Sequence, residues 1–255
     1  MLRNIAVCLC ALTLATAVSA SDEPRRVLFI GNSYTGVNQL PNVFGEIIKS
    51  VGLTIPAIKS STPGALTLLK QLSYPASLAL IDEGEWDVVV LQGQSLEPAI
   101  AESDEAIRAD FLKGAQGLCE RARAKSPQAR IYFYETWARH ADFWKSKEAM
   151  TAVGKDPAEM QARLRKWYDK AAELCKASVV RAGDAWALNY QDPKALRLHA
   201  KDNSHPEFRG TYLAALVFFH TIYHHKDLDV RYRGKLSEEE ASYLKGLAEK
   251  LAQNP

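Results

Sequence analysis

The chain has 255 residues, of which 47% are hydrophobic and 24% charged, and its formal net charge is +2. This length and balance are typical of one ordinary globular α/β domain with a sizeable core. The small net charge gives no electrostatic reason to expect nucleic acid as a partner. We therefore expect no nucleic-acid-binding function.

The first residues have the composition of a signal peptide. Arg3 gives a positive start, residues 5–18 are almost all apolar or small, and residues 18–20 supply small side chains at a cleavage point. The apolar stretch is shorter than the ~20 residues that span a bilayer, so an uncleaved anchor is the weaker alternative. We expect a signal peptide over 1–20, export to the periplasm or beyond, one domain over 21–255, and no stable membrane insertion after cleavage.

Short apolar runs then alternate with longer helical patterns. The runs typical of strands lie at 26–30, 53–59, 87–91, 130–135 and from 178 onward. The helical patterns lie at 40–51, 65–81, 102–125, 157–176, 209–223 and 237–252. This alternation predicts parallel strands joined by right-handed crossovers, and hence a three-layer α/β/α domain with a mostly parallel, five-stranded sheet.

The segment 138–156 departs from this rhythm because it is long and carries His140, Phe143 and Trp144. It follows the fourth strand and is expected at the carboxyl edge of the sheet, where open α/β folds bind ligands. Two interpretations stay open: a flap that faces substrate, or a solvated surface loop.

Gly31-Asn32-Ser33 comes directly after the first strand. A serine at that position projects into the crevice above the sheet, and the helix that follows can turn backbone N–H groups toward a developing negative charge. Alone, the same residues also fit a turn that merely ends a strand.

Near the other end, the chain reads Asp202-Asn203-Ser204-His205-Pro206. An aspartate three residues before a histidine can hold one imidazole nitrogen and leave the other to face a serine. Alone, this segment also fits a surface loop before the helix that begins near Arg209. The two segments carry chemistry only if the fold brings them together.

The two segments, in this order, resemble the SGNH/GDSL hydrolase superfamily, in a distinct branch that carries Gly-Asn-Ser and Leu-Gln-x-Gln-Ser sequences. The resemblance implies a flavodoxin-like sheet, with Ser33 as nucleophile, His205 as general base and Asp202 as the acid that orients it. It also implies an oxyanion hole made by the backbone N–H groups of Ser33 and Gly64 and by a third donor. The family has an asparagine there; this chain has Gln94, whose amide is also a donor but one methylene longer.

Further residues are candidates for weaker roles. The candidate substrate-binding residues are Asn32, Trp137 and Trp144. Asn32 stands where the family usually has Asp, and burial in the core is the alternative for Trp137. His220 and His224 have metal-ligand spacing but lack a third ligand, so we expect neither a metal nor a cofactor.

Two cysteines follow the predicted signal peptide, Cys119 and Cys175. They form either a disulfide or two buried thiols.

The resemblance implies a serine esterase that forms an acyl-enzyme. The expected substrate is a short-acyl ester or an acylated carbohydrate. Two other functions stay open: a non-catalytic protein that binds a carbohydrate or another partner on the same fold, and an acyltransferase.

Overall fold

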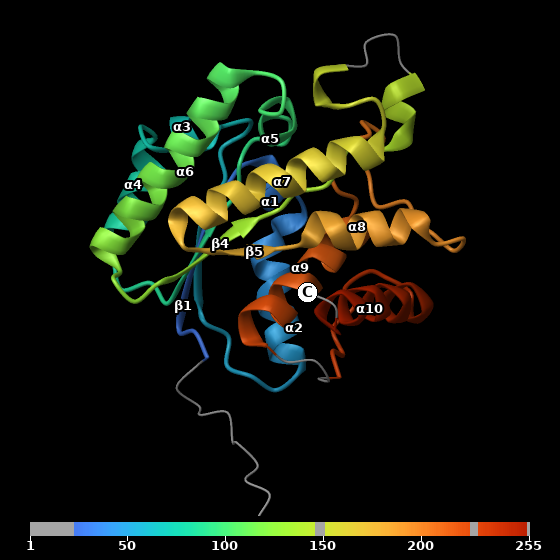
Figure 1. The fold of residues 1–255 in the computed structure, drawn as a ribbon. Helices are drawn as coiled ribbons and strands as arrows, with labels where there is room; N and C mark the ends of the chain where they lie inside the picture. Colours follow the sequence, from blue (N-terminus) through green and yellow to red (C-terminus); the bar gives the residue numbers. More distant parts are fainter. Residues whose placement is uncertain (1–22, 146–150, 225–228, 254–255) are drawn as a thin grey trace, which may run out of the picture.

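The computed structural model describes residues 23–145, 151–224 and 229–253, so the predicted signal peptide lies outside the described residues. Within these ranges, five parallel strands form one sheet in the order β2-β1-β3-β4-β5 (Figure 1). The strands are β1 (Arg26–Ile30), β2 (Ala57–Ser61), β3 (Val88–Leu91), β4 (Arg130–Tyr134) and β5 (Ser178–Val180). The expected parallel α/β sheet is confirmed.

Helices connect the strands and follow the last one. They are α1 (Ser33–Gly36), α2 (Leu40–Ser50), α3 (Leu68–Gln71), α4 (Pro75–Asp82), α5 (Glu97–Ile100), α6 (Glu105–Lys125), α7 (Pro157–Cys175), α8 (Ala182–Gln191), α9 (Phe208–Tyr223) and α10 (Glu238–Gln253). Short 3₁₀ helices are η1 (Val37–Gln39), η2 (Ala141–Lys145) and η3 (Thr151–Val153). None of the helices in the described ranges is long and apolar enough to cross a membrane.

The sheet is buried on both faces, as the continuous apolar strands predict. Because successive side chains of a strand alternate between faces, Val27 and Phe29 pack with α2, α8, α9 and α10, whereas Leu28 and Ile30 pack with α3, α4, α6 and α7. Figure 1 shows these helices on either side of the strands. The two cores fix the sheet rigidly between its helical layers.

The strand order reverses direction between β1 and β3. From β1 the chain moves to β2 on one side, and then returns to β3 on the other side of β1. Ile30 pairs with Leu91 at the carboxyl ends of the two strands, so the residues that follow, beginning with Gly31 and Gln92, lie beside each other. This switch point is where open α/β sheets bind ligands.

Two predicted elements were wrong in their bounds, and proline explains both. The second strand begins at Ala57, not at residue 53, because Pro56 has no N–H to donate to a neighbouring strand. The single helix expected over 65–81 is two helices, α3 and α4. Pro75 begins the second of them, since proline fits the first turn of a helix but interrupts the interior.

Cys119 of α6 and Cys175 of α7 are both buried free thiols. Of the two alternatives for this pair, the structure has the unbridged one.

Candidate active site

Ser33 is the first residue of α1, directly beyond the end of β1. Asn32 caps this short helix: its backbone is extended (φ −138°, ψ −153°) and its side chain accepts a hydrogen bond from the Tyr34 N–H. The cap lets the chain turn sharply from strand to helix, which leaves Ser33 half-buried at the carboxyl edge of the sheet.

Gln92 holds this turn in place from the end of β3. Its Oε1 atom accepts hydrogen bonds from the Asn32 N–H and the Thr35 hydroxyl, both at 2.9 Å, and its Nε2 atom donates to Asn32 Oδ1 at 2.9 Å. Gln71 adds a further bond, from Nε2 to the Gly31 carbonyl at 2.6 Å. Because both glutamines are fully buried, these bonds fix the serine-bearing turn without competition from water.

The structure brings Ser33, His205 and Asp202 into one hydrogen-bonded chain. Ser33 Oγ lies 2.9 Å from His205 Nε2, and His205 Nδ1 lies 2.6 Å from Asp202 Oδ2. This is the order of contacts that lets an imidazole take a proton from a serine while a carboxylate fixes its orientation.

Asp202 is held by its own loop as well as by the imidazole. Its Oδ1 atom accepts the backbone N–H groups of Ser204 at 3.0 Å and His205 at 2.9 Å. Partial burial tends to raise the pKa of the Asp202 carboxyl, but the hydrogen bonds from the His205 side chain and from these two N–H groups together hold it below its usual range. Asp202 is therefore ionised at neutral pH.

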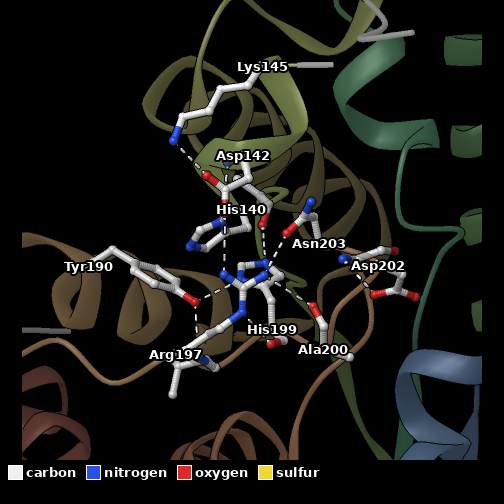
Figure 2. A network of polar contacts seen from close by, with 12 residues as sticks. His140, Asp142, Lys145, Tyr190, Arg197, His199, Ala200, Asp202 and Asn203 are labelled. Atoms are coloured by element: carbon white, nitrogen blue, oxygen red, sulfur yellow. Dashed lines mark hydrogen bonds and ion pairs between the residues drawn. The ribbon is translucent and has the colours of Figure 1, made fainter. Parts of the chain in front are cut away.

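A polar network fastens the loop that carries Asp202 and His205 to the segment after β4 (Figure 2). Arg197 donates to Asn203 Oδ1 at 2.7 Å and reaches Asp142 at 3.4 Å, and the His140 N–H donates to the Asn203 carbonyl at 3.1 Å. Asn203 has a left-handed backbone (φ 59°), which asparagine adopts more readily than most residues. The segment 138–145 thus directly supports the loop that carries Asp202 and His205.

Trp137 lies behind this loop and is only 1% exposed. One ring face stacks on Tyr34 with centroids 4.7 Å apart, and the other stacks on Trp186 at 3.8 Å. Its indole N–H donates to the Ser204 carbonyl at 3.0 Å. With both faces covered, Trp137 supports the loop and has no free ring face for a substrate, so of its two interpretations the structure has burial in the core.

The other two candidate substrate-binding residues also have partners within the protein. Asn32 is 2% exposed, and its amide nitrogen donates to the Leu66 and Gly93 carbonyls, each at 3.2 Å. Trp144 is half-buried and donates to the Gly154 carbonyl at 2.9 Å. Asn32 therefore shapes the serine turn, while Trp144 connects η2 to Gly154 and is half-buried.

The segments that carry the predicted oxyanion-hole residues contact the Ser33 turn through Asn32, which donates to the Leu66 and Gly93 carbonyls. Gln94 is half-buried, and its Oε1 atom accepts the N–H groups of Leu96 at 2.7 Å and Glu97 at 3.1 Å, at the start of α5. Within the part of the chain that the structure describes, its Nε2 atom makes no hydrogen bond. The side chain is thus fixed by its oxygen, with its two amide hydrogens available to a ligand.

Gly64 lies exposed in the turn between β2 and α3. The backbone N–H groups of Gly64 and Ser33 have no hydrogen-bond acceptor among the described residues. Both are therefore available as donors, as the resemblance implies.

An aromatic cavity of about 370 Å³ lies beside the segment after β4. Trp186, Tyr190 and His199 contribute to its wall, together with Trp137, Arg139, His140, Asp156, Gln161 and Gln191. The Ala138 carbonyl can only accept, so His199 Nε2 donates to it at 2.9 Å, and the neutral His199 Nδ1 accepts the Tyr190 hydroxyl at 2.7 Å. Tyr190 Oη in turn accepts the Leu198 N–H at 3.0 Å. Burial lowers the pKa of His199 to about 3, and this histidine is therefore a neutral structural residue.

His220 lies in the last turn of α9 and His224 is the C-cap residue of that helix. Among the described residues, no three His, Cys, Asp or Glu side chains gather closely enough to hold a metal ion.

Sequence reasoning found Ser33, His205 and Asp202 but missed the residues that hold them. The roles of Gln92, Gln71 and the aromatic stack depend on contacts across the fold. A buried glutamine after a buried strand was the one available signal, since an uncharged amide in such a place needs several partners.

Comparisons with solved structures agree with this architecture. The chain shares its fold with solved structures that are described as a lipase/acylhydrolase, a GDSL-like lipase and an acetylxylan esterase, as the resemblance implies for the fold. A lipase/acylhydrolase from Enterococcus faecalis matches with a TM-score of 0.58 and 15% identity, over 82% of this chain and 100% of that one. An acetylxylan esterase from Geobacillus stearothermophilus matches with a TM-score of 0.56 and 14% identity, over 78% and 94%.

A more similar fold belongs to a DUF4886 family protein from Bacteroides uniformis. It matches with a TM-score of 0.75 and 17% identity, over 90% of this chain and 95% of that one. No protein-family model and no curated protein sequence matches the chain. The similarity to these structures therefore concerns the fold, and the chemistry has to be argued from the site itself.

Proposed function

We propose that this protein is an exported serine hydrolase that cleaves carboxylic esters. The single observation that carries the proposal is the hydrogen-bonded chain from Ser33 through His205 to Asp202, at the carboxyl edge of the sheet. Structures that share this fold are described as a lipase/acylhydrolase and an acetylxylan esterase. The intact order of contacts favours a catalyst over a protein that only binds a partner.

The first step is attack on the ester carbonyl. His205 Nε2 removes the Ser33 hydroxyl proton as Oγ bonds to the carbonyl carbon, and Asp202 stabilises the imidazolium that results. The negative charge that develops on the carbonyl oxygen is held by the N–H groups of Ser33 and Gly64 and by the Gln94 amide. His205 then protonates the alcohol as it leaves, and an acyl group stays on Ser33.

Water completes the cycle by the same route. The side chains of His205 and Asp202 are 36% and 49% exposed, so water reaches the imidazole. His205 removes a proton from that water, which attacks the acyl-enzyme and releases the acid. This exposure supports hydrolysis over acyl transfer to another alcohol.

An acylated carbohydrate with a short acyl group is the substrate class we favour. The exposure of the base and acid indicates an open crevice, which suits a small acyl group on a polar carrier. The aromatic cavity beside the crevice has a volume of about 370 Å³, and its wall includes Tyr190, which is 38% exposed. Aromatic side chains with nearby amides and carboxylates form walls suited to a sugar ring.

Turnover of a series of aryl esters with increasing acyl length tests this proposal. We expect wild-type activity on the acetyl ester to exceed that on octanoyl and longer esters, and Ser33→Ala to abolish activity on all of them. Ser73→Ala is the matched control, because the Ser73 hydroxyl is exposed and donates to the Lys70 carbonyl. Wild-type activity in Ser33→Ala would overturn the assignment of the nucleophile.

A further inference from the structure

Arg139 lies beside the candidate site but has no part in the mechanism described above. It follows β4 in the chain and is 8% exposed, which is unusual for an arginine. Within the described ranges, its guanidinium hydrogen-bonds only to hydroxyl groups and has no carboxylate partner. A buried cation held by neutral groups costs free energy, so a function for it is expected.

The guanidinium joins two hydroxyl groups from different parts of the fold. Its Nη1 group donates to the Tyr34 hydroxyl, and its Nη2 group donates to Ser95 Oγ at 3.1 Å. It also lies over the Tyr34 ring, 5.8 Å from the centroid. Since Arg139 can only donate, the Tyr34 hydroxyl accepts from it and can donate its own hydrogen to Ser204 Oγ, 2.9 Å away.

Each of the three hydroxyl residues is the chain neighbour of a residue in the proposed mechanism. Tyr34 follows Ser33, Ser95 follows Gln94, and Ser204 precedes His205. One guanidinium therefore connects the turn that carries the nucleophile, the turn that carries an oxyanion donor and the loop that carries the base.

The Tyr34 ring extends this connection to the imidazole. It meets the His205 ring edge-on, with centroids 5.4 Å apart. Burial raises the pKa of Tyr34, while the Arg139 charge and the hydrogen bonds with Ser204 and Ser95 oppose that rise only in part. Tyr34 is therefore a neutral phenol and does not compensate the positive charge of Arg139.

We propose that Arg139 is a positioning residue: it holds Ser33, Gln94 and His205 in the relative geometry that the transition state requires. This inference rests on the proposed function. The planar fork of arginine can direct two N–H groups to two fixed hydroxyls at once, whereas the ammonium of a lysine offers a single point charge. Small errors in the placement of reacting groups reduce rates strongly, so the residue acts on the rate of the chemical step rather than on binding.

The test compares Arg139→Ala and Arg139→Lys with Arg26→Met. Arg26 is a matched control because its guanidinium also lies on an aromatic ring, 4.4 Å from the Trp86 centroid, at the opposite end of β1. On the short-acyl ester, we expect Arg139→Ala to lower kcat about 100-fold with KM nearly unchanged. Methylguanidinium in the buffer should restore at least a tenth of the rate that Arg139→Ala loses. Arg139→Lys should keep only part of the wild-type kcat.

A second readout needs no turnover. In proton NMR spectra, the low-field resonance of the hydrogen bond between His205 Nδ1 and Asp202 should shift or broaden in both Arg139 variants and stay unchanged in Arg26→Met. If Arg139→Ala does not fold, as judged by circular dichroism, Arg139→Lys carries both measurements, with a kcat loss of about tenfold expected.

Two kinetic results would overturn the positioning role: a kcat within twofold of wild type in the folded Arg139 variants, or an effect confined to KM. An unchanged low-field resonance would overturn it as well, even for a protein without esterase activity. Absence of turnover in the wild-type protein would instead overturn the proposed function, so the two failures are distinguishable.

Discussion

Ser33 Oγ and His205 Nε2 lie 2.9 Å apart although 172 residues separate them in the chain. Ser33 is fixed from β3 through Gln92, and His205 is fixed through the loop that Arg197 and Trp137 hold. The contact thus depends on two turns, each held by its own contacts and joined to the other through Tyr34 and Ser204. Substitutions that remove the contacts of either turn should therefore disturb the hydrogen bond between Ser33 and His205.

Asp202→Asn tests the orienting carboxylate. The amide can occupy the same volume, but it favours the wrong imidazole tautomer and does not stabilise the imidazolium. We expect kcat to fall by about 10³- to 10⁴-fold, with the fold unchanged by circular dichroism. Asp192→Asn, at the end of α8, is the control and should keep wild-type kinetics. A loss of less than tenfold in Asp202→Asn would remove Asp202 from the triad.

Gln94→Glu tests the amide nitrogen of Gln94 separately from its side-chain oxygen. A glutamate keeps an acceptor for the Leu96 and Glu97 N–H groups, but it replaces the amide donor with a negative charge. We expect kcat to fall by at least about 10²-fold, as for the loss of an oxyanion donor elsewhere. Gln116→Glu, on the exposed surface of α6, is the matched control. Equal kinetics for the two variants would exclude Gln94 from the oxyanion hole.

Gly31→Ala tests how closely the serine turn is packed. An added Cβ would lie 2.5 Å from Thr35 Oγ1 and 2.8 Å from Gln92 Oε1, closer than atoms tolerate. The bonds that Gln92 makes to the turn would have to move, so we expect a loss of about 1–3 kcal/mol in the free energy of unfolding and a loss of activity. Gly246→Ala, where nothing lies within 4 Å, should cost neither. Urea unfolding and ester turnover measure both; a stable, active Gly31→Ala would contradict the packing described.

His199→Gln tests a pH dependence of stability. In the folded protein His199 is neutral down to its pKa of about 3, whereas its ordinary value is 6.5. Below pH 6.5 the unfolded chain binds a proton that the folded protein does not, so the free energy of unfolding decreases as the pH falls. Between pH 7 and pH 5 this contribution amounts to about 2 kcal/mol.

The variant should lack this part of the pH dependence. Urea unfolding at pH 7 and pH 5 measures the difference for both proteins. Parallel pH dependence in the wild type and in His199→Gln would show that His199 is protonated in the folded state.

The sequence predicted the parts of this fold that depend on local pattern. The bounds of β1 were correct because residues 26–30 are a continuous apolar run ended by glycine. Ser33, Asp202 and His205 were brought together by the family resemblance, and the structure places them in hydrogen-bonding contact although Asp202 and His205 lie in a loop between α8 and α9. The division of the helix expected over 65–81 was also visible in Pro75, and the prediction gave that proline too little weight.

The supports of the site were not predictable in the same way. The sequence left Trp137 either at the crevice or in the core, and only the positions of Tyr34 and Trp186 show that both of its faces are covered. Arg139 carried no signal at all, because its two partners, Tyr34 and Ser95, belong to distant segments of the chain. Contacts of this kind follow from the folded geometry and not from any local spacing.

Covalent labelling with a fluorophosphonate tests the central claim most directly, because the reagent reacts with a serine only when a base activates it. Intact mass and peptide mapping give the stoichiometry and the position of the label. The account predicts one label per chain, on the peptide that contains Ser33, no label in Ser33→Ala and much slower labelling in His205→Ala. A wild-type protein that stays unlabelled, or a Ser33→Ala variant that is labelled as fast as the wild type, would contradict it.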